Sequence, residues 1–295
     1  MTPAPGFELR PRGIGELLDL AVLVYRERFP VFAVLGMALG AAQWGSQLVQ
    51  QLALGQAGSA AGANPGTFLL AMYGAMFVSM VLLAVLYALF SMPVLATMDE
   101  LLKGRNISTG EALRKSLPRT GPVIATALLQ LLVTLPFCIC MFVGAFVPMV
   151  ILILAVPAVY FEGRGPVGAL QRSYQMQVER GGRQGAADRN WVRTIALMIG
   201  TGIVVYALYM FAGLPLAIAQ LVWLSDGGVP VNTAFGPQFM PLYIVLPLQL
   251  MGQLLTGIFM PIGILVWGLF YYDIRVRHEA LDLELGAREL AQETP

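Results

Sequence analysis

The sequence predicts an all-α integral membrane protein with six transmembrane helices in three hairpins, each preceded by a cytoplasmic interfacial amphipathic helix. Three observations predict this class: the composition, the spacing of the charges, and a weak internal repeat. Of 295 residues, 57% are hydrophobic and 12% are charged, whereas soluble domains carry about 25% charged residues. So few charges cannot cover a soluble globule, and the mean hydropathy of +0.72 agrees with a membrane protein. The net charge of +1 gives no sign of a nucleic-acid partner.

Long uncharged segments give the number of spans. They cover residues 29–98, 120–161, 194–225 and 227–272. A helix needs about 20 apolar residues to cross the hydrocarbon core. The first segment is long enough for two spans and contains a Gly-rich break at Gly55–Gly66, and the second fits two short spans joined by a tight turn. The expected spans are 29–53, 67–98, 121–139, 143–161, 194–223 and 241–272.

The basic residues give the orientation. All 18 Lys and Arg residues fall before the first span, after the second, after the fourth, or in the C-terminal tail. Six spans place these four segments on one side, and Lys and Arg accumulate in cytoplasmic segments. Both termini are therefore expected in the cytoplasm, with the protein in a bacterial inner membrane. The chain begins without the early apolar core of a cleavable signal, so the first span is expected to remain as an anchor.

Each cytoplasmic segment before a pair of spans resembles the others. The three read GELLDLAVLVYRERF from Gly15, GEALRKSLPRTG from Gly110 and VGALQRSYQM from Val167. In the first, apolar residues recur at helical spacing, which favours a short amphipathic helix at the membrane interface. The middle unit is shorter, so its hairpin should tilt less or stop short of the outer surface. The expected organisation is one membrane domain over 1–295, with pseudo-repeats 13–98, 108–162 and 166–273 and an amphipathic cytoplasmic tail helix over 274–295.

Uncharged polar side chains within the spans are candidate binding residues. An amide that faces lipid is costly unless it is hydrogen-bonded, so the glutamines of the spans should point at other helices. They would form either a polar cavity or hydrogen-bonded contacts between helices, and the sequence leaves both readings open. These glutamines are Gln43, Gln47, Gln50, Gln130, Gln220, Gln249 and Gln253.

An acidic residue ends the outgoing span of each unit. These residues are Asp99, Glu162 and Asp273. They could form a cation-binding ring at the cytoplasmic surface, or each could pair with a nearby arginine, such as Arg164 or Arg275. In the first span, a GxxxG motif that begins at Gly36 would allow close helix packing, either within the chain or in a dimer.

Catalytic signatures are absent from the sequence. It contains no GxSxG, HExxH, GxxxxGK[ST] or CxxC motif. Its single histidine, His278, leaves little scope for histidine-based acid–base or metal chemistry. No Asp, Glu, Lys or Arg lies deep within a span, which argues against a proton-coupled transporter. We therefore expect a protein that is not an enzyme and that uses no cofactor or metal.

Three segments resemble one group of bacterial six-span proteins. They are LRPRGIGELLDLAVLVYRERFPVF, VPAVYFEGRGPVGALQRSYQM and YYDIRVRHEALDLEL. This group is similar to the membrane domain attached to some glycerophosphoryl diester phosphodiesterases. The resemblance implies a fold and a membrane address but no catalytic residues, because the chain has no room for a phosphodiesterase domain. The sequence departs from the group at Glu179–Arg193, where extra Gly- and Arg-rich residues precede Asn190 and Trp191.

These observations favour a non-catalytic membrane scaffold or accessory module. The alternative is a transporter or permease component with a Gln-lined cavity, and a third hypothesis is lipid-linked catalysis at the cytoplasmic surface. The expected partners are the lipid bilayer and a membrane or cytosolic protein, while the sequence does not determine the oligomeric state. A wide cavity lined by Gln43, Gln47, Gln130, Gln220 and Gln253 would favour transport, and a closed bundle would favour the scaffold.

Overall fold

The computed structural model describes residues 11–60, 65–138, 143–179, 190–226, 231–233, 236–238 and 240–279. Six of its helical segments are long and apolar enough to cross a membrane, which confirms the predicted all-α membrane-type fold. The helices are α1 (Ile14–Glu27), α2 (Phe29–Ala60), α3 (Pro65–Leu102), α4 (Thr109–Cys138), α5 (Val143–Leu152), α6 (Ala155–Glu162), α7 (Pro166–Tyr174), the π-helix η1 (Gln175–Glu179), α8 (Asn190–Ser225) and α9 (Leu242–Glu279). Two short antiparallel strands, β1 (Val231–Thr233) and β2 (Gly236–Gln238), lie between α8 and α9.

The spanning segments agree with the predicted spans at most of their ends. The exception is the third, which begins 12 residues before the predicted residue 121, because α4 is helical from Thr109. The six segments are Phe29–Ala53, Leu69–Leu102, Thr109–Phe137, Gly144–Glu162, Asn190–Ser225 and Leu242–Arg277.

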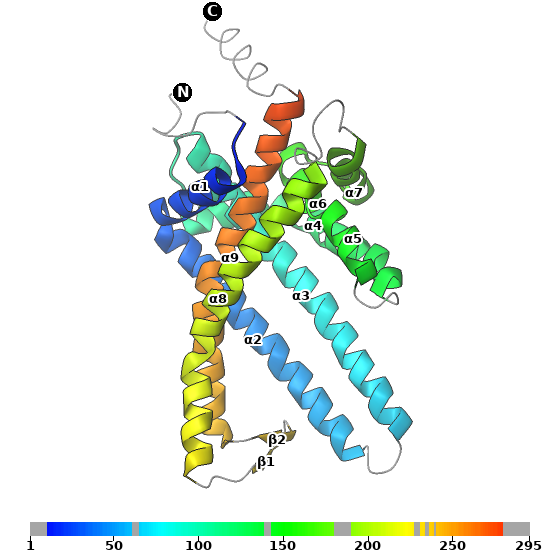
Figure 1. Ribbon diagram of the computed structural model, residues 1–295, viewed down its shortest axis with the longest axis vertical. Coiled ribbons are helices and arrows are strands. Elements are labelled where there is room, and N and C mark those ends of the chain that lie inside the picture. The colour runs from blue at the N-terminus through cyan, green and yellow to red at the C-terminus, as the bar shows by residue number, and fades with distance from the viewer. Residues whose placement is uncertain are drawn as a thin grey trace, which may run out of the picture.

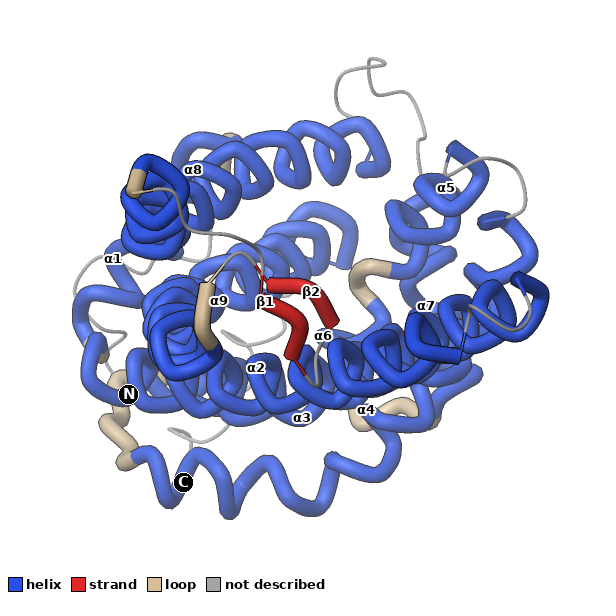
Figure 2. The backbone as a smooth tube through the Cα atoms, turned by 90° about the horizontal axis from the view of Figure 1, so that it is seen from below, coloured by secondary structure: helices blue, strands red, loops and turns tan. Residues whose placement is uncertain are grey.

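The longest helices form two diverging pairs, α2 with α3 and α8 with α9 (Figure 1). The pairs are joined where α2 packs on α9, near the end of the molecule that carries α1, α6 and α7. We call this the basic end, because the loops and helix termini that contain the described Lys and Arg residues lie there. At the opposite end, β2 contacts α2, and the two strands lie among the surrounding helices in the view along the long axis (Figure 2).

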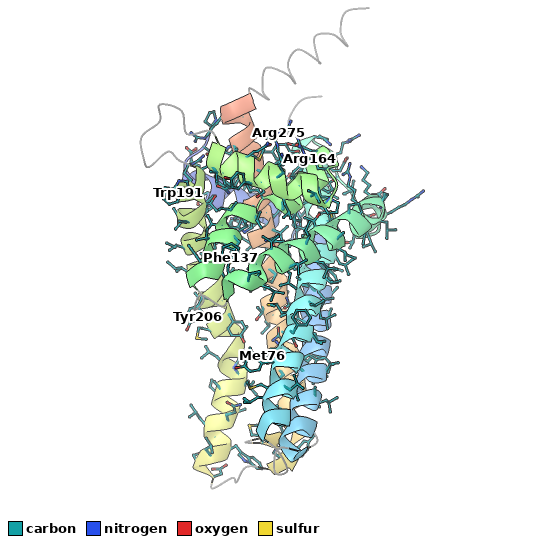
Figure 3. All side chains as sticks on the ribbon, turned by 90° about the vertical axis from the view of Figure 1, so that its right-hand side faces the viewer. Met76, Phe137, Arg164, Trp191, Tyr206 and Arg275 are labelled. Carbon is teal, nitrogen blue, oxygen red and sulfur yellow. The ribbon has the colours of Figure 1, made fainter. Side chains whose placement is uncertain are left out.

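The middle hairpin, α4 with α5 and α6, is shorter than the other two. Figure 3 shows α4 crossing the long helices obliquely, so that Phe137 near its end lies closer to the basic end than Met76 of α3 does. The hairpin therefore stops well short of the far end of the molecule. The sequence predicted that this hairpin would either tilt less or stop short of the outer surface, and the oblique α4 agrees with the second alternative only. The oblique course comes from the packing of α4 against α3, α6 and α7.

The fourth span is a broken helix, and its break is hydrogen-bonded by another helix. α5 ends at Leu152, and α6 begins at Ala155, two residues before Pro157. Proline lacks an N–H and its ring clashes with the preceding turn, which favours a break at this point. The buried hydroxyl of Ser173 in α7 donates to the Ile151 carbonyl at 2.6 Å and accepts from the Leu154 N–H at 3.2 Å. These bonds satisfy backbone groups that lipid could not.

Two of the three predicted interfacial helices are separate elements. α1 ends at Glu27, and the non-helical Arg28 separates it from α2. α7 is likewise distinct from α8. The prediction is wrong for the middle unit, because α4 is one continuous helix and contains the segment expected to lie apart from the span. In α4 the Ser116 hydroxyl donates to the Leu113 carbonyl and the Thr120 hydroxyl donates to the Ser116 carbonyl, so both bonds lie within α4 itself.

The beginnings of α1 and α4 share a backbone contact that follows from the repeated Gly-Glu pair. The Gly13 N–H donates to the Glu16 carboxylate at 3.3 Å, and the Ser108 N–H donates to Glu111 at 2.8 Å. A carboxylate three residues into a helix satisfies a donor that the helix itself leaves unpaired. The predicted tail helix of 274–295 is continuous with α9 as far as Glu279, and its remainder lies outside the described residues.

Candidate functional site

Three consecutive residues of α9 bond to every hairpin at the basic end. The Tyr271 hydroxyl donates to Glu162 Oε1 of α6 at 2.5 Å, and the Tyr272 hydroxyl donates to Asp99 Oδ1 of α3 at 2.9 Å. The third residue, Asp273, bonds to the segment before α1 and to α8. We call Tyr271, Tyr272 and Asp273 the YYD cluster. The cluster therefore contacts all three acids that the sequence singled out, since it contains one and binds two.

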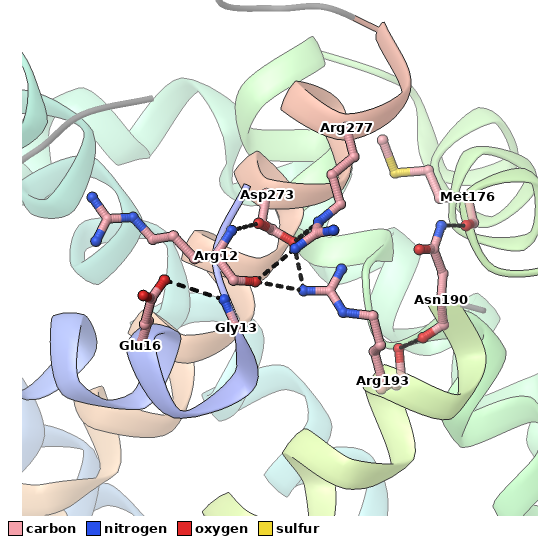
Figure 4. A network of polar contacts seen from close by, with 9 residues as sticks. Arg12, Gly13, Glu16, Met176, Asn190, Arg193, Asp273 and Arg277 are labelled. Carbon is pink, nitrogen blue, oxygen red and sulfur yellow. Dashed lines mark hydrogen bonds and ion pairs between the residues drawn. The ribbon is translucent and has the colours of Figure 1, made fainter. Parts of the chain in front are cut away.

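Asp273 lies at the centre of a buried ion-pair network (Figure 4). Its carboxylate accepts from the Arg12 backbone N–H at 2.7 Å and pairs with Arg193 at 2.8 Å and Arg277 at 2.9 Å. Both arginines also donate to the Arg12 carbonyl, at 3.0 and 2.8 Å. The Arg193 guanidinium lies 5.4 Å from the centre of the Phe270 ring. The Arg193 side chain is 7% exposed and that of Asp273 2% exposed, so each requires the other as a counter-charge.

The other two acids are also paired with cations. Arg164 and Arg275, which the sequence suggested as partners, both approach Glu162. Each acid has its own set of cations, so the acids do not face a shared open site, and the described residues include no cluster of three or more His, Cys, Asp or Glu side chains placed to hold a metal ion. The pairs are Asp99–Lys103 (2.5 Å), Glu162–Arg164 (2.5 Å), Glu162–Arg172 (2.9 Å) and Glu162–Arg275 (3.8 Å).

A small polar cavity lies between α2, α8 and α9. It has a volume of about 190 Å³, and its lining includes Gln47, Gln249, Gln253 and Thr256. The Gln253 amide donates to the Gln47 carbonyl oxygen at 3.1 Å, which links α9 to α2. Ligand pockets have volumes of about 300–1,000 Å³. This space is therefore smaller than a typical ligand pocket, and two of its polar groups bond to each other.

The seven predicted glutamines do not form one site. The structure places three of them in the small polar cavity. Gln43, Gln50 and Gln220 are partly exposed and lie outside the lining of that cavity. Gln130 lines a different cavity, between α3, α4, α5, α6 and α9. The glutamine side chains therefore lie at separate places. Gln130 is far from those of α2 because α4 is oblique and does not lie beside the outer part of α2.

The larger cavity was not predicted from the sequence. It has a volume of about 590 Å³ and lies between α3, α4, α5, α6 and α9. One wall of the cavity consists of α4 residues at helical spacing. This stripe of mostly apolar side chains is the feature of the sequence that could have indicated a cavity beside α4. The α4 residues are Ala127, Gln130, Leu131 and Thr134, and the other walls are formed by residues such as Ser91, Leu95, Met149, Val156, Ile264 and Trp267.

The GxxxG motif packs within the chain. Gly36 and Gly40 of α2 lie against the backbone of α9, and a methyl group on either would overlap the carbonyl of Gly257 or Gln253. A methyl group on Gly257 would in turn overlap the Gly36 carbonyl. Of the two uses that the motif allowed, the structure shows internal packing. This close approach places Gln47 and Gln253 on adjoining turns of the two helices.

The fold and these contacts define a helical membrane protein with six spanning segments, cross-linked at its basic end by the YYD cluster. Its distinguishing features are a broken fourth span, a small amide-lined cavity and a larger apolar one. Comparisons with protein families, with curated proteins and with solved structures find no match for this chain.

Proposed function

We propose that this protein is a non-catalytic scaffold or accessory module of the bacterial inner membrane. The observation that carries the proposal is the YYD cluster, in which three successive residues of α9 bond to α6, to α3, and to α8 with the segment before α1. Such bonding holds every hairpin in a fixed position at the basic end. A rigid frame is what a protein needs if it presents a constant surface to a partner.

The arrangement of charges supports a cytoplasmic location for the basic end. The described basic residues lie in loops and helix termini at one end, and this asymmetry is the usual sign of a cytoplasmic face. The resemblance of three segments to a membrane domain that accompanies phosphodiesterases also favours an accessory role. The partner on this proposal is another membrane protein or a cytosolic protein at the basic end.

A transport role is the alternative, and one observation favours it. Gln47, Gln249, Gln253 and Thr256 converge on one intramembrane space between α2, α8 and α9. Passage of a solute would require this space to widen and the Gln47–Gln253 hydrogen bond to break. Alternating access also requires parts of a transporter to rock against one another, whereas the YYD cluster bonds the hairpins together.

The experiment compares two double variants in a strain that lacks the chromosomal copy. One variant, Tyr272→Phe with Asp273→Asn, weakens the YYD cluster, and the other, Gln47→Leu with Gln253→Leu, removes the amides of the small cavity. The readout is the native mass of the solubilised complex and the membrane abundance of the proteins that co-migrate with it. A scaffold predicts that the cluster variant loses the complex and lowers partner abundance at least several-fold, while the cavity variant retains both.

A transporter predicts the opposite pattern. The cavity variant would then lose function while its complex and abundance stay unchanged, and vesicles containing the purified protein would show solute flux that the cavity variant lacks. Equal membrane levels of both variants are needed for the comparison and are measured by immunoblot. A cavity variant that loses the phenotype of the wild-type gene at equal membrane level would contradict the scaffold proposal.

A further inference from the structure

The larger cavity is open at one side and closed at its base. Phe146 and Met149 of α5, at its mouth, are 42% and 49% exposed. Ser91 and Leu95 of α3 are at most 1% exposed, and Trp267 of α9 is 9% exposed. The cavity thus runs from the outer surface of the spanning segments inward to α9. Its mouth faces the region that membrane lipid occupies.

The walls of the cavity offer mainly hydrocarbon. The Ser91 hydroxyl donates to the Ala88 carbonyl at 2.9 Å, and the Thr134 hydroxyl donates to the Gln130 carbonyl at 2.8 Å, so both bond within their own helices. Water enters a cavity only where it finds two to four polar partners. An empty apolar space forfeits dispersion contacts along its whole lining. A hydrocarbon chain from the adjoining bilayer restores these dispersion contacts and needs no polar partner.

A cation lies where the headgroup of such a lipid would be. Arg119 is exposed on α4, and its guanidinium lies 4.8 Å from the centre of the Tyr160 ring. Arg119 precedes Gln130 by 11 residues, which is three helical turns, so both lie on nearly the same face about 16 Å apart. One leaflet measures about 20 Å from its headgroup region to the bilayer midplane. Val123 and Thr126, which lie between these two residues on this face of α4, are 0% exposed, so a phospholipid whose phosphate lies at Arg119 would send its chain into the cavity through the mouth beside α5.

We propose that the cavity holds one acyl chain of an anionic phospholipid whose phosphate binds Arg119. The site is independent of the scaffold role, because none of its groups belongs to the YYD cluster. Among the residues that the structure describes, Gln130 is the one amide in the lining of the cavity, and the acyl chain passes it without needing a hydrogen bond. The bound chain fills the space between the broken fourth span and α3, so it supports the packing of the middle hairpin.

Trp267 reports directly on the occupant of the cavity. A variant keeps this tryptophan and replaces Trp44, Trp191 and Trp223 by phenylalanine. It is reconstituted into vesicles of phosphatidylethanolamine and phosphatidylglycerol whose acyl chains carry bromine, which quenches tryptophan on near contact. Because Trp267 is shielded from lipid outside the protein, we expect its fluorescence to fall at least two-fold only if a brominated chain enters the cavity. Fluorescence equal to that in unbrominated vesicles would overturn the proposal.

Blocking variants separate the cavity from the general lipid surface. Ala127→Leu adds bulk inside the cavity and should restore most of the Trp267 fluorescence in brominated vesicles. Ala125→Leu adds the same bulk on the exposed side of α4 and should leave the quenching unchanged. Ala145→Leu fills the cavity from α5 and serves if the first variant unfolds. Equal quenching in blocked and control variants would show that the chain lies outside the cavity and refute the site.

Two further substitutions test the headgroup and the amide. Brominated phosphatidylglycerol at low mole fraction should quench Trp267 at least three-fold more than brominated phosphatidylcholine does, and Arg119→Gln should abolish that preference. Arg114→Gln, on another face of α4, should retain it. Gln130→Leu should leave the quenching intact. Loss of quenching in Gln130→Leu would instead indicate a ligand held through the amide, and absence of a preference for the anionic lipid would exclude the role of Arg119.

Discussion

Ser173 and Ser116 occupy the same position in the repeated sequence but have different structural roles. Ser116 is buried in α4 and donates to the Leu113 carbonyl of its own helix at 2.7 Å. Ser173 instead bonds to both sides of the break between α5 and α6. The hydroxyl of Ser116 is redundant, since that carbonyl belongs to a continuous helix. Ser173 supplies partners that no water in a bilayer would replace.

Replacing each serine by alanine should therefore give unequal effects. Ser173→Ala leaves the Leu154 N–H and the Ile151 carbonyl without this partner, so we expect a loss of about 1–3 kcal/mol in the free energy of unfolding. Ser116→Ala should cost less than about 0.6 kcal/mol, which is typical of membrane hydrogen bonds. Unfolding of both variants by mixed-micelle titration measures the difference. Equal losses would show that Ser173 does not support the break.

Asp273 and Asp99 allow a comparison of an ion pair in which both side chains are buried with one in which the cation is exposed. Asp273→Asn leaves the Arg193 guanidinium, 7% exposed, without its counter-charge and should cost about 3–5 kcal/mol of stability. Asp99→Asn removes the partner of Lys103, which is 45% exposed, and should cost about 0–1 kcal/mol. The thermal midpoint in a mild detergent distinguishes the two. A small effect for Asp273→Asn would mean that water reaches Arg193 and that the cluster is not a rigid frame.

At the scale of elements, the contact between α2 and α9 depends on glycine. Gly36 and Gly257 meet backbone to backbone, with no space for a methyl group on either. The buried hydroxyl of Tyr25 in α1 strengthens the same region by donating to the Ile258 carbonyl at 2.7 Å. Burial raises the pKa of Tyr25 to about 12. The close backbone contact of α2 with α9 therefore lies next to the residue of α9 that Tyr25 of α1 binds.

Gly257→Ala should force α2 and α9 apart. Overpacking of this kind costs about 1–3 kcal/mol, and the shift should also lengthen the Gln47–Gln253 hydrogen bond. Gly45→Ala, in α2 but with nothing within 4 Å of the added methyl, should be neutral or stabilising by up to about 1 kcal/mol. The unfolding free energy of each variant tests this contrast. If Gly45→Ala also destabilised the protein, the loss in Gly257→Ala could not be assigned to the close contact between α2 and α9.

At the scale of the whole molecule, the segregation of basic residues predicts how the chain is threaded. Single cysteines are placed at Thr109 and Asn232 in a background where Cys138 and Cys140 are replaced by serine. In intact spheroplasts an impermeant maleimide should label Asn232 and should reach Thr109 only after the membrane is opened. Labelling of Thr109 from outside would contradict a cytoplasmic basic end.

The candidate site was only partly visible in the sequence. The glutamines of α2 and α9 were expected to face other helices, and Gln47 bonds to Gln253. Gln130 was grouped with them, but it lies in another cavity because α4 is oblique. The acids were expected where the outgoing spans end; Asp99 and Glu162 lie in the last turns of α3 and α6, whereas α9 continues past Asp273 to Glu279. The connection of the acids through Tyr271 and Tyr272 was not foreseen, since two tyrosines in a row carry no sign of which helices they meet.

The sequence by itself determined the membrane class, the six spans and the location of the charges, because hydrocarbon excludes charge locally along the chain. It also predicted that α1 and α7 are separate short helices. Only the tertiary structure decided that α4 is continuous, that α5 and α6 are one span with a break, and which helices enclose each cavity. These features depend on partners far away in the chain. Ser173 bonds to the broken helix, and Ala127 lines a cavity, only because the packing of the other helices brings these residues to those places.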